Sequence, residues 1–356
     1  MRKESLEFLR KLLTSPTPSG FESPGQKVWC EYARTFADKV STDAYGNAVA
    51  VLNAKGGPKI MLDGHVDELG LMVKHIDEKG FIYFQRIGGV DPAVIRTKRV
   101  NIHTAKGVVR GVIGATAIHL QDREKDKKAP KMHECWIDIG AKDADDARKR
   151  VAVGDPVVFV DDFEMLDEHV GVARAFDNRI GVWTVIEAMR IVKQASKKPQ
   201  CAIYACSSIQ EEVGCVGAGM NADALKPDAA VVVDATHATD TPGVDAKQHG
   251  EVKMGKGPTI SIGREHHPVL TERLRAVAKK KKIDLQVEAF STSGGTDAMT
   301  IHKKQGGIPS ALLSIPGRYM HTTVEMIDLR DLQAAADLLA AFLLDIKKGE
   351  TFKVKV

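Results

Sequence analysis

Two adjacent carboxylates, Glu211 and Glu212, stand between an apolar run and a glycine-rich stretch in "SSIQEEVGCVGAG", residues 207–219. Glutamate is seldom buried without a partner, so one interpretation is the solvated end of a strand. The other interpretation is that each carboxylate has a separate chemical role. The choice depends on the other acidic and histidine residues that follow apolar runs.

A histidine and an aspartate flank a valine in "DGHVDELG", as His65, Val66 and Asp67. On an extended strand, residues two apart project from the same face. The pair is therefore either an ordinary hydrogen-bonded couple or a metal-binding histidine with the carboxylate that orients it.

Three further residues have both an ordinary and a metal-binding interpretation. Asp177 stands at the start of a long helical pattern in "AFDNRIG", where aspartate is also a good N-cap. Asp234 ends the apolar "VVVD", as a turn residue would. His321 in "RYMHTTVEM" follows another apolar run, as a loop histidine would.

Taken together, these residues favour a metal centre. The runs at 62–67, 204–212 and 229–234 each end in an acid or a histidine, and the carboxyl ends of strands in an open α/β sheet border the crevice where ligands bind. Oxygen and nitrogen ligands without thiolates suit zinc, cobalt or manganese. A carboxylate that bridges two ions about 3.5–4 Å apart would create a hydrolytic di-metal centre.

The rest of the chain supplies the elements that would position these residues. Apolar strand-like runs alternate with amphipathic helical patterns, which predicts an α/β fold with a mostly parallel or mixed sheet covered by helices on both faces. The expected helices span 2–14, 23–38, 178–195, 269–281 and 329–347, and the expected strands lie near 47–52 and at 59–67, 201–209, 229–235 and 309–315.

Residues 70–169 break this alternation. Short β-branched runs punctuated by glycine, with one helical candidate near 142–149, predict a small β-barrel inserted into the α/β domain formed by 1–69 and 170–356. The polar "QDREKDKKAPK" at 121–131 predicts a loop of this module.

The composition excludes several classes of partner. A net charge of +4 over 356 residues gives no case for nucleic acid, and no apolar run approaches the roughly 20 residues of a membrane span.

The five cysteines are odd in number and lack a Cys-x-x-Cys spacing. They are expected to be reduced thiols of a cytoplasmic protein.

The order of the motifs carries a family resemblance. "GHVDELG", "AFDNRIG", "QEEVGCVGA", "VVVDATHATD", "STSGGTDA" and "GIPSALLSIPGRYMHTTVE" follow one another as in the tetrahedral (TET) and glutamyl aminopeptidases, which the chain resembles over essentially its whole length. These are di-metal peptidases of the clan of co-catalytic zinc aminopeptidases. The resemblance implies a zinc aminopeptidase-like α/β domain interrupted by a PDZ-like β-barrel, and a metal-dependent aminopeptidase that acts on short peptides.

The resemblance also implies the role of each site residue. It assigns two divalent ions per subunit, zinc or cobalt, to five ligands. The first ion would be held by His65, Asp177 and Asp234, and the second by Asp177, Glu212 and His321.

Two further residues would complete the catalytic group, with Asp67 orienting His65 and Glu211 acting as the general acid/base. Neighbouring residues of an extended segment point in different directions, so Glu212 can bind a metal while Glu211 faces the substrate. Nearby cations also make the double negative charge favourable. The resemblance further implies a cis peptide bond after Asp177.

The pocket for the first substrate residue is less defined than the metal centre. Its candidates are Gly294, Gly295, Arg264 and Arg318. The chain has "HTTVE" where many relatives have His-Ser-Pro-Val-Glu, so the loop after His321 is expected to be shaped differently.

The resemblance implies a homo-oligomer as well, in which the barrel mediates dimerisation and dimers assemble into a tetrahedral dodecamer with enclosed active sites. The 121–131 loop would either reach a neighbouring subunit's site or be solvated.

Two other functions fit the sequence less well. An endoglucanase-type glycoside hydrolase needs two carboxyl groups that face each other across a bond, at roughly 5–9.5 Å, which adjacent glutamates do not provide. A non-catalytic scaffold would not need the complete set of ligands and the acid.

Overall fold

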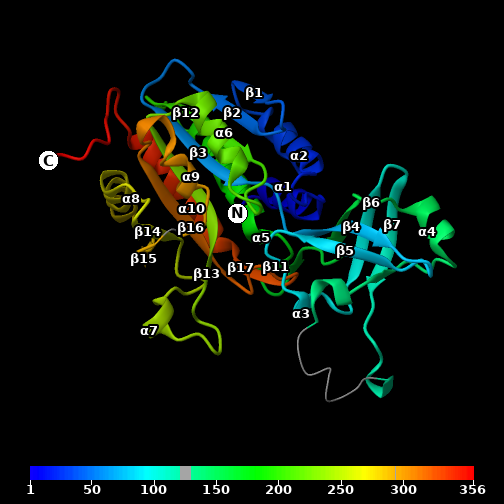
Figure 1. Ribbon diagram of the computed structural model, residues 1–356. Helices are drawn as coiled ribbons and strands as arrows, with labels where there is room; N and C mark the ends of the chain where they lie inside the picture. The colour runs from blue at the N-terminus through cyan, green and yellow to red at the C-terminus, as the bar shows by residue number, and fades with distance from the viewer. Residues whose placement is uncertain (121–129, 293) are drawn as a thin grey trace.

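The computed structural model describes residues 1–120, 130–292 and 294–356, and it consists of an α/β body with a smaller β-barrel beside it (Figure 1). The expected fold class, a mixed sheet flanked by helices with an inserted small barrel, is confirmed. Most of the segment expected to form a loop at 121–131 lies outside the described residues.

Four parallel strands form the middle of the α/β sheet, in the order β12, β3, β13 and β16. They are β3 Lys59–His65, β12 Ala202–Ser208, β13 Ala229–His237 and β16 Ser310–Arg318. His65 pairs with Ser208, so β3 and β12 end level with each other. The segments that follow them therefore leave the sheet at the same edge.

Shorter strands extend the sheet on both sides. β2 pairs antiparallel with β12 and β17 pairs antiparallel with β16, so the sheet is mixed. Beyond these, β1 lies outside β2, β11 and β10 continue from β17, and β14 pairs with both β15 and β16. The outer strands are β1 Lys39–Thr42, β2 Ala48–Leu52, β10 Glu164–Met165, β11 Val170–Ala173, β14 Thr259–Gly263, β15 Gln286–Phe290 and β17 Glu325–Asp328.

Alternating side chains of the central strands reach two separate helix layers. Leu62 and Val231 belong to one core, whereas Met61 and Val232 belong to the other, as expected where successive residues of a strand face opposite sides. The first core includes side chains of α1 Lys3–Thr14, α2 Ser23–Ala33, α5 Phe176–Gln194, α8 Pro268–Lys281 and α10 Leu329–Asp345. The second includes side chains of α6 Val216–Leu225 and α9 Ala298–Ile301.

Two helices differ from the sequence-based expectation. The helix expected at 23–38 ends at Ala33. A tighter turn follows, in which the Thr35 N–H donates to the Tyr32 carbonyl at 3.1 Å and the Phe36 N–H to the Ala33 carbonyl at 3.2 Å. Helix α6 was not predicted, since its glycines disfavour a helix by propensity. Packing explains Gly217, where a Cβ atom would lie 2.3 Å from Asn47 Oδ1.

The inserted module is a closed antiparallel barrel with its own core, in the order β4-β5-β8-β7-β6-β9. Leu71, Ile102 and Val157 are among its buried side chains. Its strands are β4 Gly70–Ile76, β5 Ile82–Ile87, β6 Arg99–Thr104, β7 Gly107–Ile113, β8 Ile137–Asp138 and β9 Pro156–Phe159. Its helices are α3 Pro92–Ile95 and α4 Ala144–Arg150, the second close to the expected helical candidate.

The short remaining elements are α7 Ala246–His249 and the 3-10 turns Ile118–Leu120, Met132–Glu134 and Lys304–Gly306. Among the helices of the described residues, none has both the length and the apolar character that a membrane span requires.

A buried ion network lies where the chain passes from the α/β body into the barrel. Glu68, two residues before β4, pairs with Arg174 and with Arg179, whose Nη2 lies 2.6 Å from the Glu68 carboxylate. Arg179 is fully buried and also donates to the Leu13 carbonyl at 2.9 Å and to Thr17. The network thus connects α5, the loop after α1 and the entry to the barrel.

Replacing Arg179 by methionine should destabilise the protein strongly. The substitution leaves Glu68 with one of its two cationic partners and removes the donor to Leu13, and breaking a buried ion pair costs about 3–5 kcal/mol in the free energy of unfolding. Denaturant unfolding followed by circular dichroism measures this loss. The matched control is Arg275→Met, which removes an exposed pair with Glu272 and should cost about 0–1 kcal/mol. Equal effects of the two substitutions would contradict the role assigned to the network.

Candidate metal centre and active site

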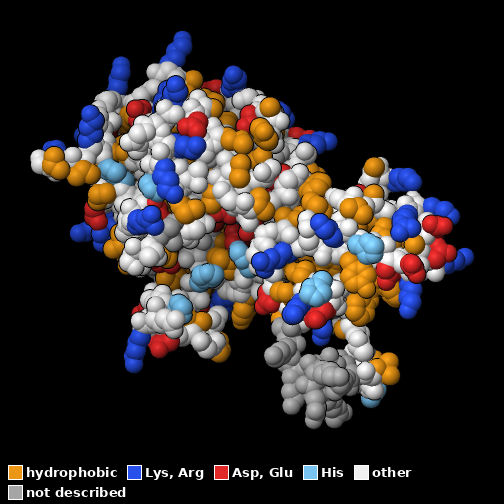
Figure 2. All heavy atoms as spheres, in the orientation of Figure 1, with side chains coloured by type: hydrophobic (Ala, Val, Ile, Leu, Met, Phe, Trp, Pro, Cys, Tyr) orange, Lys and Arg blue, Asp and Glu red, His pale blue; other side chains and the backbone are white. Residues whose placement is uncertain are grey.

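The acids and histidines singled out in the sequence meet at one edge of the central sheet. His65 is the last residue of β3, Asp234 lies in β13, and the paired glutamates follow β12. The start of α5 contributes Asp177 to the same place. Figure 2 shows a hollow between the α/β body and the barrel in which acidic and histidine side chains gather.

His65 is buried and presents its two ring nitrogens to different carboxylates. Nδ1 lies 3.4 Å from Asp67 Oδ1. On the opposite side of the ring, Nε2 lies 3.4 Å from Asp177 Oδ1 and 3.8 Å from Asp234 Oδ1. This division leaves Nε2 facing the other acids while Asp67 fixes the plane of the ring.

Asp177 lies between the two histidines. Its Oδ1 faces His65 at 3.4 Å, and its Oδ2 faces His321 Nε2 at the same separation. His321 Nε2 is in turn 3.7 Å from Glu212 Oε2. The peptide bond between Asp177 and Asn178 is cis, as the family resemblance implied.

The side chains form two compact groups of possible metal ligands. Within each group, one nitrogen or oxygen atom per residue lies within 4.8 Å of the others. The groups are His65, Glu211 and Asp234, and Asp177, Glu212 and His321. The first group therefore contains Glu211 where the resemblance implies Asp177. Asp177 is nevertheless the closer of the two to His65: its Oδ1 lies 3.4 Å from Nε2, whereas Glu211 Oε2 lies 3.7 Å away.

The electrostatics of these groups fit divalent cations. Burial, followed by the charge of Asp177, raises the pKa of Glu212 well above its usual range, and burial does the same to the pKa of Asp234. Burial also raises the pKa of Asp177, but hydrogen bonds from His321 and His65 outweigh it and leave that pKa low. Glu212 Oε1 is buried without a hydrogen-bond partner in the described residues. A cation supplies the charge and the coordination that these oxygens lack.

Asp67 also holds the backbone of the paired glutamates. Its two carboxylate oxygens accept the N–H groups of Glu211 at 3.0 Å and Glu212 at 3.2 Å, and Oδ2 accepts the Ser19 hydroxyl at 2.7 Å. Asp67 therefore fixes His65 and the Glu-Glu segment relative to each other. The sequence suggested the first of these contacts and gave no sign of the second.

Glu325 is a positioning residue that the sequence interpretation did not assign. It is buried, and its two carboxylate oxygens accept the N–H groups of Asp177 and His321, each at 2.9 Å. Its position at the end of "HTTVE", four residues after a candidate ligand, was the available signal. Glu325 thus aligns two of the candidate ligands through their backbone.

The site opens into a cleft of about 710 Å³, to which the barrel side also contributes. Gly89, after β5, is one of its lining residues, and a Cβ atom there would lie 2.8 Å from His321 Nδ1. Of the residues considered for the first substrate pocket, Gly294 and Gly295 line the cleft. Arg264 and Arg318 are not among its lining residues, and Arg318 pairs with Asp240 at 2.8 Å.

Several known proteins with similar sequences and structures are aminopeptidases. A family model, M42 glutamyl aminopeptidase, matches residues 46–338. The lysyl aminopeptidase of Pyrococcus furiosus is 34% identical over 96% of this chain and 97% of its own length.

Two solved structures extend this similarity to the whole fold. A TET aminopeptidase from a marine sediment archaeon, Thaumarchaeota archaeon SCGC AB-539-E09, superimposes with a TM-score of 0.92 at 33% identity, covering 96% of each chain. The TET1 peptidase of Pyrococcus horikoshii, which can assemble into a tetrahedron or a large octahedral shell, gives a TM-score of 0.85 at 31% identity, over 96% of this chain and 100% of that one. The resemblance stated from the motifs is confirmed, and the chain belongs to the M42 glutamyl aminopeptidase family of metal-dependent aminopeptidases.

Proposed function

We propose that the chain removes N-terminal residues from short peptides with two divalent cations, zinc or cobalt, and with Glu211 as the general acid/base. His65, Asp177 and Asp234 would hold one cation, and Asp177, Glu212 and His321 the other. The observation that carries this proposal is the position of Asp177, whose two oxygens face the two histidines at 3.4 Å each. A carboxylate in that position can bridge two ions.

The bound ions would lower the pKa of the attacking water and polarise the scissile carbonyl. Glu211 is suited to take the proton of that water. Its Oε2 lies on the side of His65 and its Oε1 accepts the Cys215 thiol, so one oxygen is free to face the reaction. Burial raises the pKa of Glu211, although the charge of His65 opposes the shift, and a raised pKa brings a carboxyl group closer to the proton affinity that general acid-base catalysis needs.

A glycoside hydrolase fits this arrangement poorly. Asp67 anchors the backbone N–H groups of both glutamates, so Glu211 and Glu212 stay on one side of the site. They cannot take the two faces of a glycosidic bond, which that reaction requires. A scaffold without activity would have no use for a set of buried carboxylates whose charges repel one another.

We further propose that the barrel, residues 70–169, mediates dimerisation and that the dimers form a closed shell of twelve subunits with enclosed sites. Two observations support this proposal. Val108 and Val112, which flank the exposed Arg110 on one face of β7, are 54% and 46% exposed, and exposed apolar side chains are natural contact points. The similar Pyrococcus horikoshii TET1 peptidase can assemble into a tetrahedron or a large octahedral shell, and one of its structures is a dodecamer.

Asp177→Ala should lower the bound metal below one ion per subunit and abolish peptidase activity, because both proposed ion sites lose a ligand. Elemental analysis of the dialysed protein, together with an aminoacyl-arylamide assay, measures both effects. Asp240→Ala is the control, since Asp240 pairs with Arg318 and belongs to neither group of candidate ligands, so its loss should leave the metal content unchanged. Full metal content in Asp177→Ala would refute the bridging assignment.

The two glutamates should respond differently to the same substitution. Glu211→Gln should keep both metals and lose about 10²–10⁴-fold in turnover, which is the usual contribution of a general acid/base. Glu212→Gln should lose the metal of one site. Metal content and single-turnover kinetics, measured side by side, distinguish the variants, and identical behaviour would count against separate roles.

Light scattering of the full chain should show an assembly much larger than a dimer at micromolar concentration. Val108→Asp combined with Val112→Asp should reduce it to smaller species, because charge on the exposed face of β7 opposes apolar contact. Val287→Asp, at a 44% exposed position of β15, is the control and should leave the assembly intact. A wild-type monomer would overturn the proposal for the barrel.

A further inference from the structure

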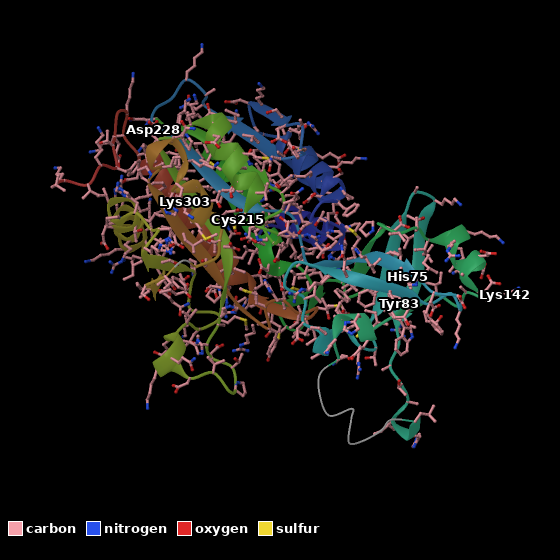
Figure 3. The ribbon with its side chains drawn as sticks, in the orientation of Figure 1. His75, Tyr83, Lys142, Cys215, Asp228 and Lys303 are labelled. Carbon is pink, nitrogen blue, oxygen red and sulfur yellow. The ribbon has the colours of Figure 1, made fainter. Side chains whose placement is uncertain are left out.

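A cysteine lies directly against the proposed general base. Cys215 precedes α6, is 4% exposed and lines the cleft. Figure 3 labels it near the middle of the α/β body. Its thiol donates a hydrogen bond to Glu211 Oε1 at 3.2 Å, while the other oxygen of Glu211 faces His65. Glu211 therefore stands between the candidate metal centre on one side and a thiol on the other.

A third acid completes this second group. Asp297 is 1% exposed, and neither of its carboxylate oxygens accepts a hydrogen bond from an N–H or hydroxyl group of the described residues. One ligand atom each of Glu211, Cys215 and Asp297 lies within 4.8 Å of the others. The unpartnered carboxylate is thus part of a group with the spacing of a metal site.

The charge around Asp297 is mainly negative, and His65 is the group that opposes it. Burial raises the pKa of Asp297 well above its usual range, and the carboxylates of Asp63 and Glu211 raise it further. Asp63 is itself fully buried and accepts the Ser208 hydroxyl at 2.6 Å. Buried carboxylates are stable when they are protonated, paired or coordinated to a metal. The cleft gives a cation a path to this group, since Cys215 and Glu211 both line it.

We propose that Cys215, Asp297 and Glu211 Oε1 form a third, inhibitory site for a soft or borderline divalent cation such as Zn²⁺ or Cd²⁺. This inference rests on the proposed function, because it takes Glu211 as the general base. On binding, the Cys215 thiol loses its proton to solvent and the sulfur becomes a metal ligand. Glu211 then coordinates the cation and no longer accepts the proton of the attacking water.

The identity of the ligands sets the selectivity of this site. The five ligands proposed for the two catalytic ions are nitrogen and oxygen donors, whereas this third group includes a thiolate, which favours soft and borderline metals. Mg²⁺ and Ca²⁺ prefer all-oxygen coordination and should not occupy it. An excess of zinc would therefore inhibit the same enzyme that zinc activates when it fills the two catalytic positions.

The test is a titration of the metal-loaded enzyme with Cd²⁺, in which thiolate-to-cadmium charge-transfer absorbance and peptidase activity are measured in the same samples. The wild type should show a band that saturates at one equivalent, with activity falling in parallel. Cadmium that only replaces a catalytic ion gives no such band, because that centre has no thiolate. Mg²⁺ at the same concentrations should produce neither effect.

Two variants address the ligands separately. Cys215→Ser keeps a donor for Glu211 and should lose the band. Its half-inhibitory Cd²⁺ concentration, measured against its own starting activity, should rise more than about tenfold, since even a residue that only orients a metal ligand contributes about 10–100-fold to metal affinity. Asp297→Asn keeps the thiol and should require a higher Cd²⁺ concentration for the same band. Cys30→Ala, which removes another buried thiol on α2, is the control and should behave as the wild type.

Three results would overturn the inference: an unchanged band in Cys215→Ser, a wild-type band without loss of activity, or inhibition by Cd²⁺ without a band. Failure of the proposed function has a different signature. It would appear as a wild type that does not cleave aminoacyl-arylamides before any Cd²⁺ is added, whereas the charge-transfer band does not depend on turnover.

Discussion

The carboxylate of Asp67 is the contact on which the geometry of the site depends. It reaches the ring of His65 at the end of β3 and the backbone N–H groups of Glu211 and Glu212 beyond the end of β12. Because β3 and β12 are parallel and end level with each other, one short side chain can contact the segments that follow both strands. Three acids and a histidine are thereby held close together. Burying that many carboxylates without compensating positive charge would cost more than the net free energy of folding.

The negative charge of the buried acids is compensated in two ways. Away from the cleft, arginines pair directly with acids, as Arg174 and Arg179 do with Glu68. Around Asp177 the described residues supply only histidines as possible cationic partners, and Glu325 adds a further buried carboxylate that aligns Asp177 and His321 through their N–H groups. The carboxylates around Asp177 therefore depend on bound cations for charge compensation, and with that compensation they can lie close together in the core.

The sequence predicts the layers and the candidate site better than it predicts the contacts that hold the site together. Continuous apolar runs identify β3, β12 and β13, and a helical pattern identifies α5. Acids or histidines at the strand ends point to a single edge, where the structure brings them together. The hydrogen bonds that Asp67 accepts from the backbone of the paired glutamates depend on tertiary positions that no local sequence pattern encodes. The same is true of the two backbone N–H groups that Glu325 accepts. Helix α6 escapes prediction for a related reason, since Gly217 is required by its contact with Asn47 and not by helix propensity.

The segments that connect the α/β body to the barrel pass directly beside the site. The chain leaves the α/β body just after Asp67 and Glu68, so the entry to β4 is fixed by the residues that orient His65 and by the buried ion network. On return from β5, Gly88 and Gly89 pass against the other half of the site, where Cβ atoms would lie 3.3 Å from Glu212 Cβ and 2.8 Å from His321 Nδ1. A side chain at Gly89 would force the His321 ring to shift, and Gly88 has a positive φ of 73° that favours glycine. The barrel therefore forms part of the wall behind two proposed ligands, so the position of the β5 exit and the position of His321 are packed against each other.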